Sequence, residues 1–320
     1  MPFVLVKAFY YHHFVLPLPA GHRFPMAKYR RLYERVGEHA DALGIELYEP
    51  AAADDAALLR VHSADYLARL AAGALTATEQ RRIGFPWSPA MVERARRSVG
   101  GTLAALEAAL RGERVAINLA GGTHHAHRDH GRGYCVFNDA VVAARHVQAL
   151  GLARRVLVVD LDVHQGNGTA ALVRDDPSIF AFSMHDARNY PALKEPGDLD
   201  VAVPEGCDDR RYLDLLAQHL PQAIARAEAD AAIYLAGADP YAGDTLGQML
   251  LSKAGLRQRD RTVLDALGRA ALPCAIAMAG GYAADVEDIV DIHFGTVCEA
   301  AMRWAADVAQ SGNAAVSSGR

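Results

Sequence analysis

Cysteine is scarce and scattered in this chain of 320 residues. The sequence contains 4 cysteines and no Cys-x-x-Cys pair, which argues against a metal site built from sulfur ligands. Because two of them lie within apolar runs, we interpret the cysteines as reduced core residues and expect a cytoplasmic protein. The four are Cys135, Cys207, Cys274 and Cys298.

Long apolar runs and an excess of positive charge are also missing. No run approaches the length of a membrane-spanning helix, and the N-terminus does not have the pattern of a signal peptide. The formal net charge of −5 gives no indication of a nucleic acid or an acidic membrane surface as partner. We interpret the short basic pairs Arg81-Arg82 and Arg96-Arg97 as solvated helix faces. The sequence does not indicate an oligomeric state.

The chain instead alternates short apolar runs with longer amphipathic stretches, and 51% of its residues are hydrophobic. The short runs predict buried strands at residues 3–8, 115–119, 156–161, 179–184, 231–236 and 274–279. The amphipathic stretches predict helices at residues 89–110, 137–150, 212–229 and 252–267. Since no long polar linker separates them, we expect one α/β domain over residues 1–305, built on a doubly wound parallel sheet, and a frayed tail over residues 306–320.

Unusual polar residues follow five of the predicted strands. The motifs are Gly121-Gly122-Thr123-His124-His125, Asp160-Leu161-Asp162-Val163-His164, Ser183-Met184-His185, Gly237-Ala238-Asp239-Pro240 and Gly280-Gly281-Tyr282. In a doubly wound sheet, ligands bind outside the carboxyl ends of the strands. We therefore expect the five motifs to converge on one site.

The most informative of these motifs contains two carboxylates and an imidazole at alternate positions. In extended chain, residues two apart point to the same side, so Asp160, Asp162 and His164 can project together. Oxygen and imidazole ligands suit a divalent transition metal. The simpler explanation is that the aspartates cap the helix that follows. Asp160 can also act behind the metal, by orienting an imidazole.

Three further candidates each have an ordinary structural explanation. Asp239 is either a turn residue or a third metal ligand that leaves an open coordination position. His124 and His125 are either solvated loop residues or a pair suited to general acid–base work near neutral pH. Tyr282 is either a core tyrosine or a donor to a developing oxyanion.

Taken together, these motifs resemble the zinc-dependent histone deacetylase family, and most of all its class IV branch and the bacterial relatives of that branch. Two further segments are similar to that branch: Leu16-Pro17-Leu18-Pro19-Ala20-Gly21-His22-Arg23-Phe24-Pro25-Met26 and Gly84-Phe85-Pro86-Trp87-Ser88. The resemblance runs in order from about residue 10 to residue 300. It implies the arginase–deacetylase fold, an eight-stranded parallel sheet flanked by helices, and removal of an acyl group from a lysine or a related amine.

The resemblance also implies a role for each candidate. Asp162, His164 and Asp239 would bind Zn²⁺. The same three ligands can also bind Fe²⁺. His125 would be the general base and then the acid, His124 its electrostatic partner oriented by Asp160, and Tyr282 the oxyanion donor. Gly133, Tyr134, Tyr190 and Leu246 would line the acyl tunnel. The backbone carbonyls of Asp160, Asp162 and His164, with Ser183, would form an inner K⁺ site.

The chain departs from many family members at Asn167, where they have an aspartate, and this departure is shared with class IV relatives, as is Gln165. A neutral partner supports a protonated imidazole less well, so the sequence leaves open which histidine carries the proton. It also leaves open the length of the acyl chain and whether the substrate is a protein, an acylpolyamine or another small acyl-amine. An arginase-like binuclear hydrolase and a catalytically silent binding module are further hypotheses that the sequence allows.

Overall fold

The computed structural model describes the backbone of residues 6–317 and the side chains of residues 6–303. In this part of the chain, eight parallel strands form one sheet in the order β2-β1-β3-β8-β7-β4-β5-β6. The strands are β1 (Val6–Phe9), β2 (Ile45–Tyr48), β3 (Val115–Asn118), β4 (Val156–Asp160), β5 (Ile179–Asp186), β6 (Leu199–Val203), β7 (Ala231–Leu235) and β8 (Cys274–Ala277). The predicted fold class is therefore confirmed.

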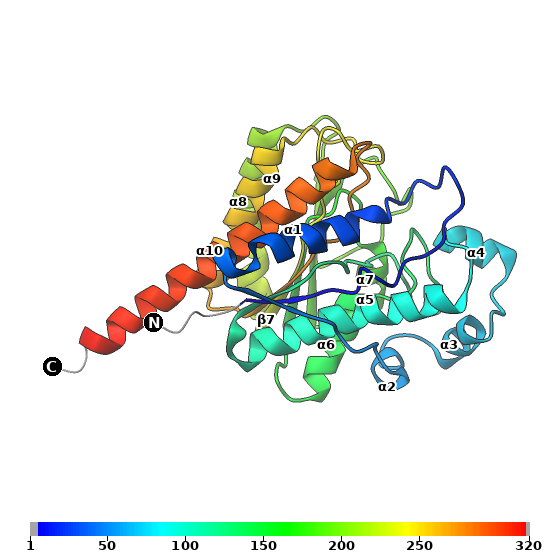
Figure 1. Cartoon of the computed structure of the whole chain (residues 1–320), viewed down its shortest axis with the longest axis horizontal. Helices are drawn as coiled ribbons and strands as arrows, with labels where there is room; N and C mark the ends of the chain where they lie inside the picture. The colour runs from blue at the N-terminus through cyan, green and yellow to red at the C-terminus, as the bar shows by residue number, and fades with distance from the viewer. Residues whose placement is uncertain (1–5, 318–320) are drawn as a thin grey trace.

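Helices cover both faces of this sheet (Figure 1). The described helices are α1 (Ala27–Leu43), α2 (Asp55–Leu58), α3 (Ala64–Ala71), α4 (Ala77–Ile83), α5 (Pro89–Ala108), α6 (Asp139–Ala149), α7 (Asn167–Val173), α8 (Asp209–Ala227), α9 (Lys253–Arg269) and α10 (Val286–Ser317). One apolar core lies between the sheet and α1, α8, α9 and α10, and a second lies between the sheet and α2, α3, α5 and α6. Such double coverage explains why all five residues of β4 are buried.

Local sequence signals set the helix boundaries. The Ser88 side chain accepts the Met91 N–H at the start of α5, and Pro89 occupies its first turn. A π-helical turn, Ala109–Glu113, follows α5 and contains Gly112 at a φ of 128°. Gly151, at a φ of 71°, follows the end of α6, as the sequence predicts. None of the described helices is both long enough and apolar enough to cross a membrane.

All six predicted strands are present, although residues 3–5 of the first lie outside the described residues. Sequence analysis missed β2 and β6, which form the two edges of the sheet. The tail predicted to fray begins inside α10, and its residues 318–320 lie outside the described residues, so its fraying stays a prediction. The cysteines are free, and Cys135, Cys207 and Cys274 are buried.

The strand order brings the five polar motifs together. They lie at the carboxyl ends of β3, β8, β7, β4 and β5, which are consecutive neighbours in the middle of the sheet. The motif Ser183-Met184-His185 lies within the last residues of β5 rather than after it. Because the strands are parallel, their carboxyl ends lie along one edge. The predicted convergence of the motifs is therefore a direct result of the topology.

Candidate active site

Asp162, His164 and Asp239 form a buried cluster just beyond the carboxyl ends of β4 and β7. Each side chain offers one atom, and these atoms all lie within 4.8 Å of one another. His164 Nδ1 lies 3.0 Å from Asp162 Oδ1 and 3.3 Å from Asp239 Oδ2. The cluster is the arrangement that a divalent cation with two oxygen ligands and one nitrogen ligand requires.

The hydrogen bonding of the cluster also fits a cation. Asp239 Oδ1 accepts the Val163 N–H at 2.9 Å, whereas Asp239 Oδ2 is buried and has no hydrogen-bond partner among the described residues. Burial, together with the nearby Asp162 carboxylate, raises the pKa of Asp239 to about 7. A divalent cation would satisfy the free oxygen and offset the repulsion between the two carboxylates.

Gly280 leaves room for these carboxylates. A Cβ atom at this position would lie 1.9 Å from Asp239 Oδ2 and 2.5 Å from Asp162 Oδ2. Its N–H donates to Asp162 Oδ2 at 2.8 Å. The backbone after β8 therefore forms one side of the cluster, and any side chain at Gly280 would displace a ligand.

The helix-capping interpretation of the Asp160 motif is wrong. Helix α7 begins at Asn167, its N-cap is Gly166, and no side chain caps it. Asp160 instead accepts a hydrogen bond from a ring nitrogen of His124, at 2.7 Å between Nδ1 and Oδ2. The carboxylate therefore orients an imidazole, which is the second role that the sequence allows for it.

His124 and His125 are both buried, and their ring centroids lie 4.1 Å apart. The interpretation of the pair as solvated loop residues is therefore wrong. His125 Nδ1 lies 2.7 Å from Asn167 Oδ1, so one histidine has a carboxylate partner and the other a neutral amide.

The different partners separate the two histidines electrostatically. Burial lowers the pKa of His124, but the charges of Asp160 and Asp162 outweigh burial and raise this pKa to about 9. Burial and the neighbouring charge of His124 hold the pKa of His125 well below its usual value. These shifts favour the proton on His124. A neutral His125 that donates from Nδ1 to Asn167 would keep Nε2 free to accept a proton.

Residues at the start of α6 fix the loop that carries this pair. Buried Asp139 accepts the N–H groups of Gly122 and Thr123 and the Thr123 hydroxyl, at 2.7–2.8 Å. Asn138 donates to the carbonyl of His124 at 3.3 Å while it caps α6. Sequence analysis missed both residues, although polar residues at the start of an otherwise apolar helix were a usable signal.

Tyr282 is held by its backbone rather than by its phenol. Its N–H donates to Asp244 Oδ2 at 2.6 Å, and its hydroxyl forms no hydrogen bond with any residue that the structure describes. Burial, with the nearby Asp162 charge, raises the pKa of the phenol well above its usual value. Tyr282 therefore keeps its proton and can donate it in a hydrogen bond to a bound substrate.

Two buried cations that sequence analysis missed support the motifs. Lys28, on α1, lies within 3.3 Å of the carbonyl oxygens of Ala279 and Gly281, next to Tyr282. Arg259, on α9, donates to the carbonyl of Gly237 at 2.6 Å, just before Asp239. Each ties the backbone at the end of a strand to a helix on the same face of the sheet.

A cavity of about 330 Å³ opens above His164, His125 and Tyr282. All four residues predicted to line an acyl tunnel line this cavity, namely Gly133, Tyr134, Tyr190 and Leu246. Gly133 allows its wall to approach His125, since a Cβ atom there would lie 2.7 Å from the His125 ring. A cavity of this size lies within the range of small-molecule sites.

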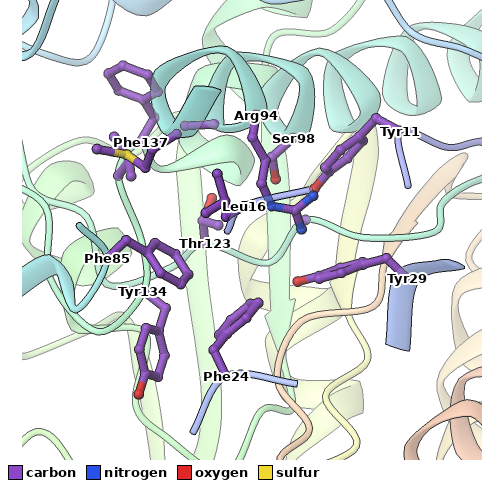
Figure 2. A pocket seen from close by; sticks show the side chains of 14 residues that line it. Tyr11, Leu16, Phe24, Tyr29, Phe85, Arg94, Ser98, Thr123, Tyr134 and Phe137 are labelled. Carbon is purple, nitrogen blue, oxygen red and sulfur yellow. The ribbon is translucent and has the colours of Figure 1, made fainter. Parts of the chain in front are cut away.

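A second, smaller cavity of about 40 Å³ has Tyr134 in its lining, as the first cavity does (Figure 2). The guanidinium of Arg94 points into it, 4.4 Å from the ring centroid of Tyr29 and 5.1 Å from that of Tyr11. None of the predicted metal ligands lines this cavity. It adjoins the candidate catalytic groups nonetheless, because it shares Tyr29, Thr123 and Tyr134 with a cavity of about 50 Å³ whose lining includes His125, Asp162 and Tyr282.

The predicted K⁺ site is less distinctive. Ser183 lies opposite Asp160 in the register of β4 and β5, and its hydroxyl is 2.9 Å from His185 Nδ1. The assignment of K⁺ to this serine and to the carbonyls of Asp160, Asp162 and His164 stays a prediction. Gln165, by contrast, has a clear structural contact: it bonds with the backbone of Glu195 in both directions, at 2.7 and 2.9 Å.

Comparisons with known proteins identify the family of the chain. The chain matches the family described as "Histone deacetylase domain" over residues 22–297. It is 44% identical over 284 residues to an uncharacterized protein of Picosynechococcus, covering 89% of this chain and 94% of that relative. It is 32% identical over 246 residues to histone deacetylase 2 of Arabidopsis thaliana, covering 74% of this chain and 63% of the relative. A histone deacetylase-like amidohydrolase of Pseudomonas aeruginosa is 29% identical over 281 residues, with 83% and 74% covered.

The chain therefore belongs to the histone deacetylase family, and it is a hydrolase of the deacetylase type. The fold agrees with that of a solved structure, the HD domain of HDA15. The two superpose with a TM-score of 0.77 over 95% of this chain and 94% of the other, at 23% identity. At that identity the similarity supports the fold alone.

Proposed function

We propose that this chain is a zinc-dependent deacylase that hydrolyses the amide between an acyl group and a lysine or a related amine. The main support is the arrangement of three kinds of group around one cavity: the cluster of Asp162, His164 and Asp239, the neutral His125, and the protonated Tyr282. The reaction needs each of them, because a carbonyl must be polarised, a water deprotonated and an oxyanion stabilised.

Asp162, His164 and Asp239 are the residues that would hold the metal. When bound, Zn²⁺ supplies a Lewis acid that polarises the amide carbonyl and makes water easier to deprotonate. The same three residues can also bind Fe²⁺, which is the alternative metal.

The remaining steps belong to the side chains. His125 takes a proton from the attacking water through Nε2, while Asn167 fixes the ring through Nδ1. The Tyr282 hydroxyl donates to the oxyanion that forms when the carbonyl is attacked. His125 then returns the proton to the leaving amine, and the carboxylate and the free amine are the products. His124 stays protonated beside Asp160 and stabilises the negative charge that develops in the site.

Gln165 and Asn167 support the placement of this chain in or near the class IV branch, as the sequence resemblance suggests. Among the described residues, the cluster of Asp162, His164 and Asp239 is the one group with the spacing of a metal site. This favours one catalytic ion over an arginase-like pair. The presence of every expected catalytic group argues against a silent binding module.

The test is turnover of lysine peptides that carry acetyl and progressively longer acyl groups, with the metal content measured on the same sample. We expect hydrolysis and about one divalent ion per chain. The acyl length that gives the highest kcat/KM identifies the substrate, and an acylated polyamine included in the series tests the small-molecule substrate. Two divalent ions per chain, or no hydrolysis of any acyl-amine by fully loaded protein, would refute the proposal.

Metal removal is the second test of the same proposal. Dialysis against a chelator should abolish activity, and added Zn²⁺ or another divalent ion should restore it. Retained turnover after the metal is verifiably gone would overturn the mechanism.

A further inference from the structure

Three arginines lie at the mouth of the active-site cavity. Arg81 and Arg82, in the last turn of α4, line the same cavity as His125, His164 and Tyr282. An adjoining surface hollow is lined by Arg81, Arg82 and Arg132, together with His130 and Tyr190. We call Arg81, Arg82 and Arg132 the arginine mouth.

No carboxylate of the described residues lines either hollow. The two carboxylates nearest to these arginines in sequence have other partners: Glu79 pairs with Arg69 at 2.5 Å, and Asp129 pairs with His130 at 2.7 Å. The chain as a whole has a net charge of −5. The arginine mouth therefore has no acidic partner among the described ion pairs, and it lies at the entrance to the candidate catalytic cavity.

The contacts of the backbone hold this group in position. The Gly133 N–H donates to the Arg82 carbonyl at 2.9 Å, and the Tyr134 N–H donates to the Ile83 carbonyl at 2.7 Å. The end of α4 is thus fixed to the wall of the cavity. Arg132 Nε donates to the Tyr190 hydroxyl at 2.6 Å, and its guanidinium lies 5.2 Å from the Tyr190 ring centroid.

Basic residues at the end of a helix have an ordinary explanation, since they interact favourably with the helix dipole. That explanation applies to Arg81 and Arg82 but not to Arg132, which lies in the loop that follows the histidine pair. It also does not explain why the Tyr190 hydroxyl, on a separate loop, fixes Arg132 at the same entrance. The sequence interpretation of Arg81-Arg82 as a solvated face is accordingly incomplete, because both side chains are exposed and also line the cavity.

We propose that the arginine mouth selects acyl-amine substrates that carry an anionic group, such as a carboxylate, close to the scissile amide. This inference rests on the proposed deacylase function and specifies its substrate class. Guanidinium groups bind carboxylates through paired hydrogen bonds, and their positive field attracts anions to the cavity. The same field disfavours acylpolyamines and basic peptide tails, which carry positive charge next to the acylated amine.

The experiment compares acetyl-lysine peptides that differ only in their flanking residues: aspartate, asparagine or lysine on both sides. A second arm compares free Nε-acetyl-lysine, which has an α-carboxylate, with its uncharged amide, and so separates acidic peptides from small acyl-amino acids. With zinc-loaded protein we expect kcat/KM to be roughly tenfold higher for the aspartate peptide than for the asparagine peptide, and lowest for the lysine peptide. This preference should decrease as salt is added.

The double variant Arg81→Gln/Arg82→Gln should reduce the preference to about twofold, and Arg132→Gln added to it should remove the rest. The matched control is Arg154→Gln/Arg269→Gln, which removes the same charge from two exposed positions. These positions precede β4 and β8, so they lie near the amino ends of the strands, away from the active site. Because Arg269 lies in the last turn of α9, the control also matches the loss of a helix-terminal cation. We expect the control to keep the full preference.

Equal or higher activity on the neutral or basic peptides would overturn the inference while leaving the deacylase function intact, and so would a preference that survives loss of all three arginines. If no peptide is hydrolysed, the proposed function fails separately. In that case, direct binding of the same uncleaved peptides to the zinc-loaded protein still measures the charge preference.

Discussion

The floor and the mouth of the active-site cavity differ in charge, burial and origin. The floor consists of buried residues located where central strands end: Asp160, Asp162, Asp239, His124, His125 and His164. The arginine mouth comes instead from the end of a short helix and from a loop, and Arg81 and Arg82 are exposed. Changes in the floor should therefore reduce the rate with every substrate, whereas changes in the mouth should reduce the difference between substrates.

The largest effect is expected for His125→Ala. Removal of a general acid–base group lowers kcat by roughly 10³-fold, and the loss should be the same for acidic and neutral substrates. The control is His39→Ala, an exposed residue on α1. Steady-state kinetics on zinc-loaded variants measure both. A loss of less than tenfold would show that another group is the base.

The Tyr282→Phe variant should lose less, roughly 10²-fold in kcat with little change in KM, because one oxyanion donor is removed. Tyr212→Phe is a matched control, since the Tyr212 hydroxyl is buried without a hydrogen-bond partner among the described residues and lies on α8. Near-normal turnover by Tyr282→Phe would refute the assigned role. Since His125 and Tyr282 act on the same transition state, their effects should not add in the double variant.

The difference between the floor and the mouth of the cavity also explains which residues could be predicted from the sequence. Asp162, His164 and Asp239 directly follow continuous apolar strands, so a local pattern places them at the carboxyl edge of the sheet. The edge strands β2 and β6 were missed because they are short and mix buried and exposed residues, whereas the strands that were predicted are continuous apolar runs.

Supporting residues could not be predicted, because their roles depend on contacts between distant segments. Lys28 contacts the Ala279 carbonyl across 251 residues, and nothing in its local sequence separates it from an exposed helical lysine. Arg81 and Arg82 likewise have an ordinary helix-end pattern. Their importance follows from the backbone bonds that join α4 to the loop at Gly133.

The Asn167→Asp variant tests the floor of the cavity while keeping the metal ligands, His125 and Tyr282 in place. A carboxylate in place of the Asn167 amide would stabilise the protonated form of His125 and raise its pKa. Because His125 must be neutral to accept a proton, the acid limb of the kcat/KM profile should move to higher pH, with a smaller change at the optimum. Measurement of kcat/KM across the pH range, with metal content checked at each end, tests this. An unmoved limb, or one displaced to lower pH, would show that His125 is not the group that titrates.

The smallest effect is expected at the mouth, for Tyr190→Phe. The substitution keeps the aromatic ring beside the Arg132 guanidinium and removes only the hydroxyl that accepts from Nε at 2.6 Å. Arg132 would then be positioned less firmly, and the advantage of an acidic over a neutral substrate should fall by at most about twofold, the share assigned to Arg132 itself. The ratio of the two kcat/KM values is the informative measurement, because it cancels any general loss of rate. A fall in both values with an unchanged ratio would assign Tyr190 to the wall of the cavity, shared by all substrates, rather than to the selection of charge at its entrance.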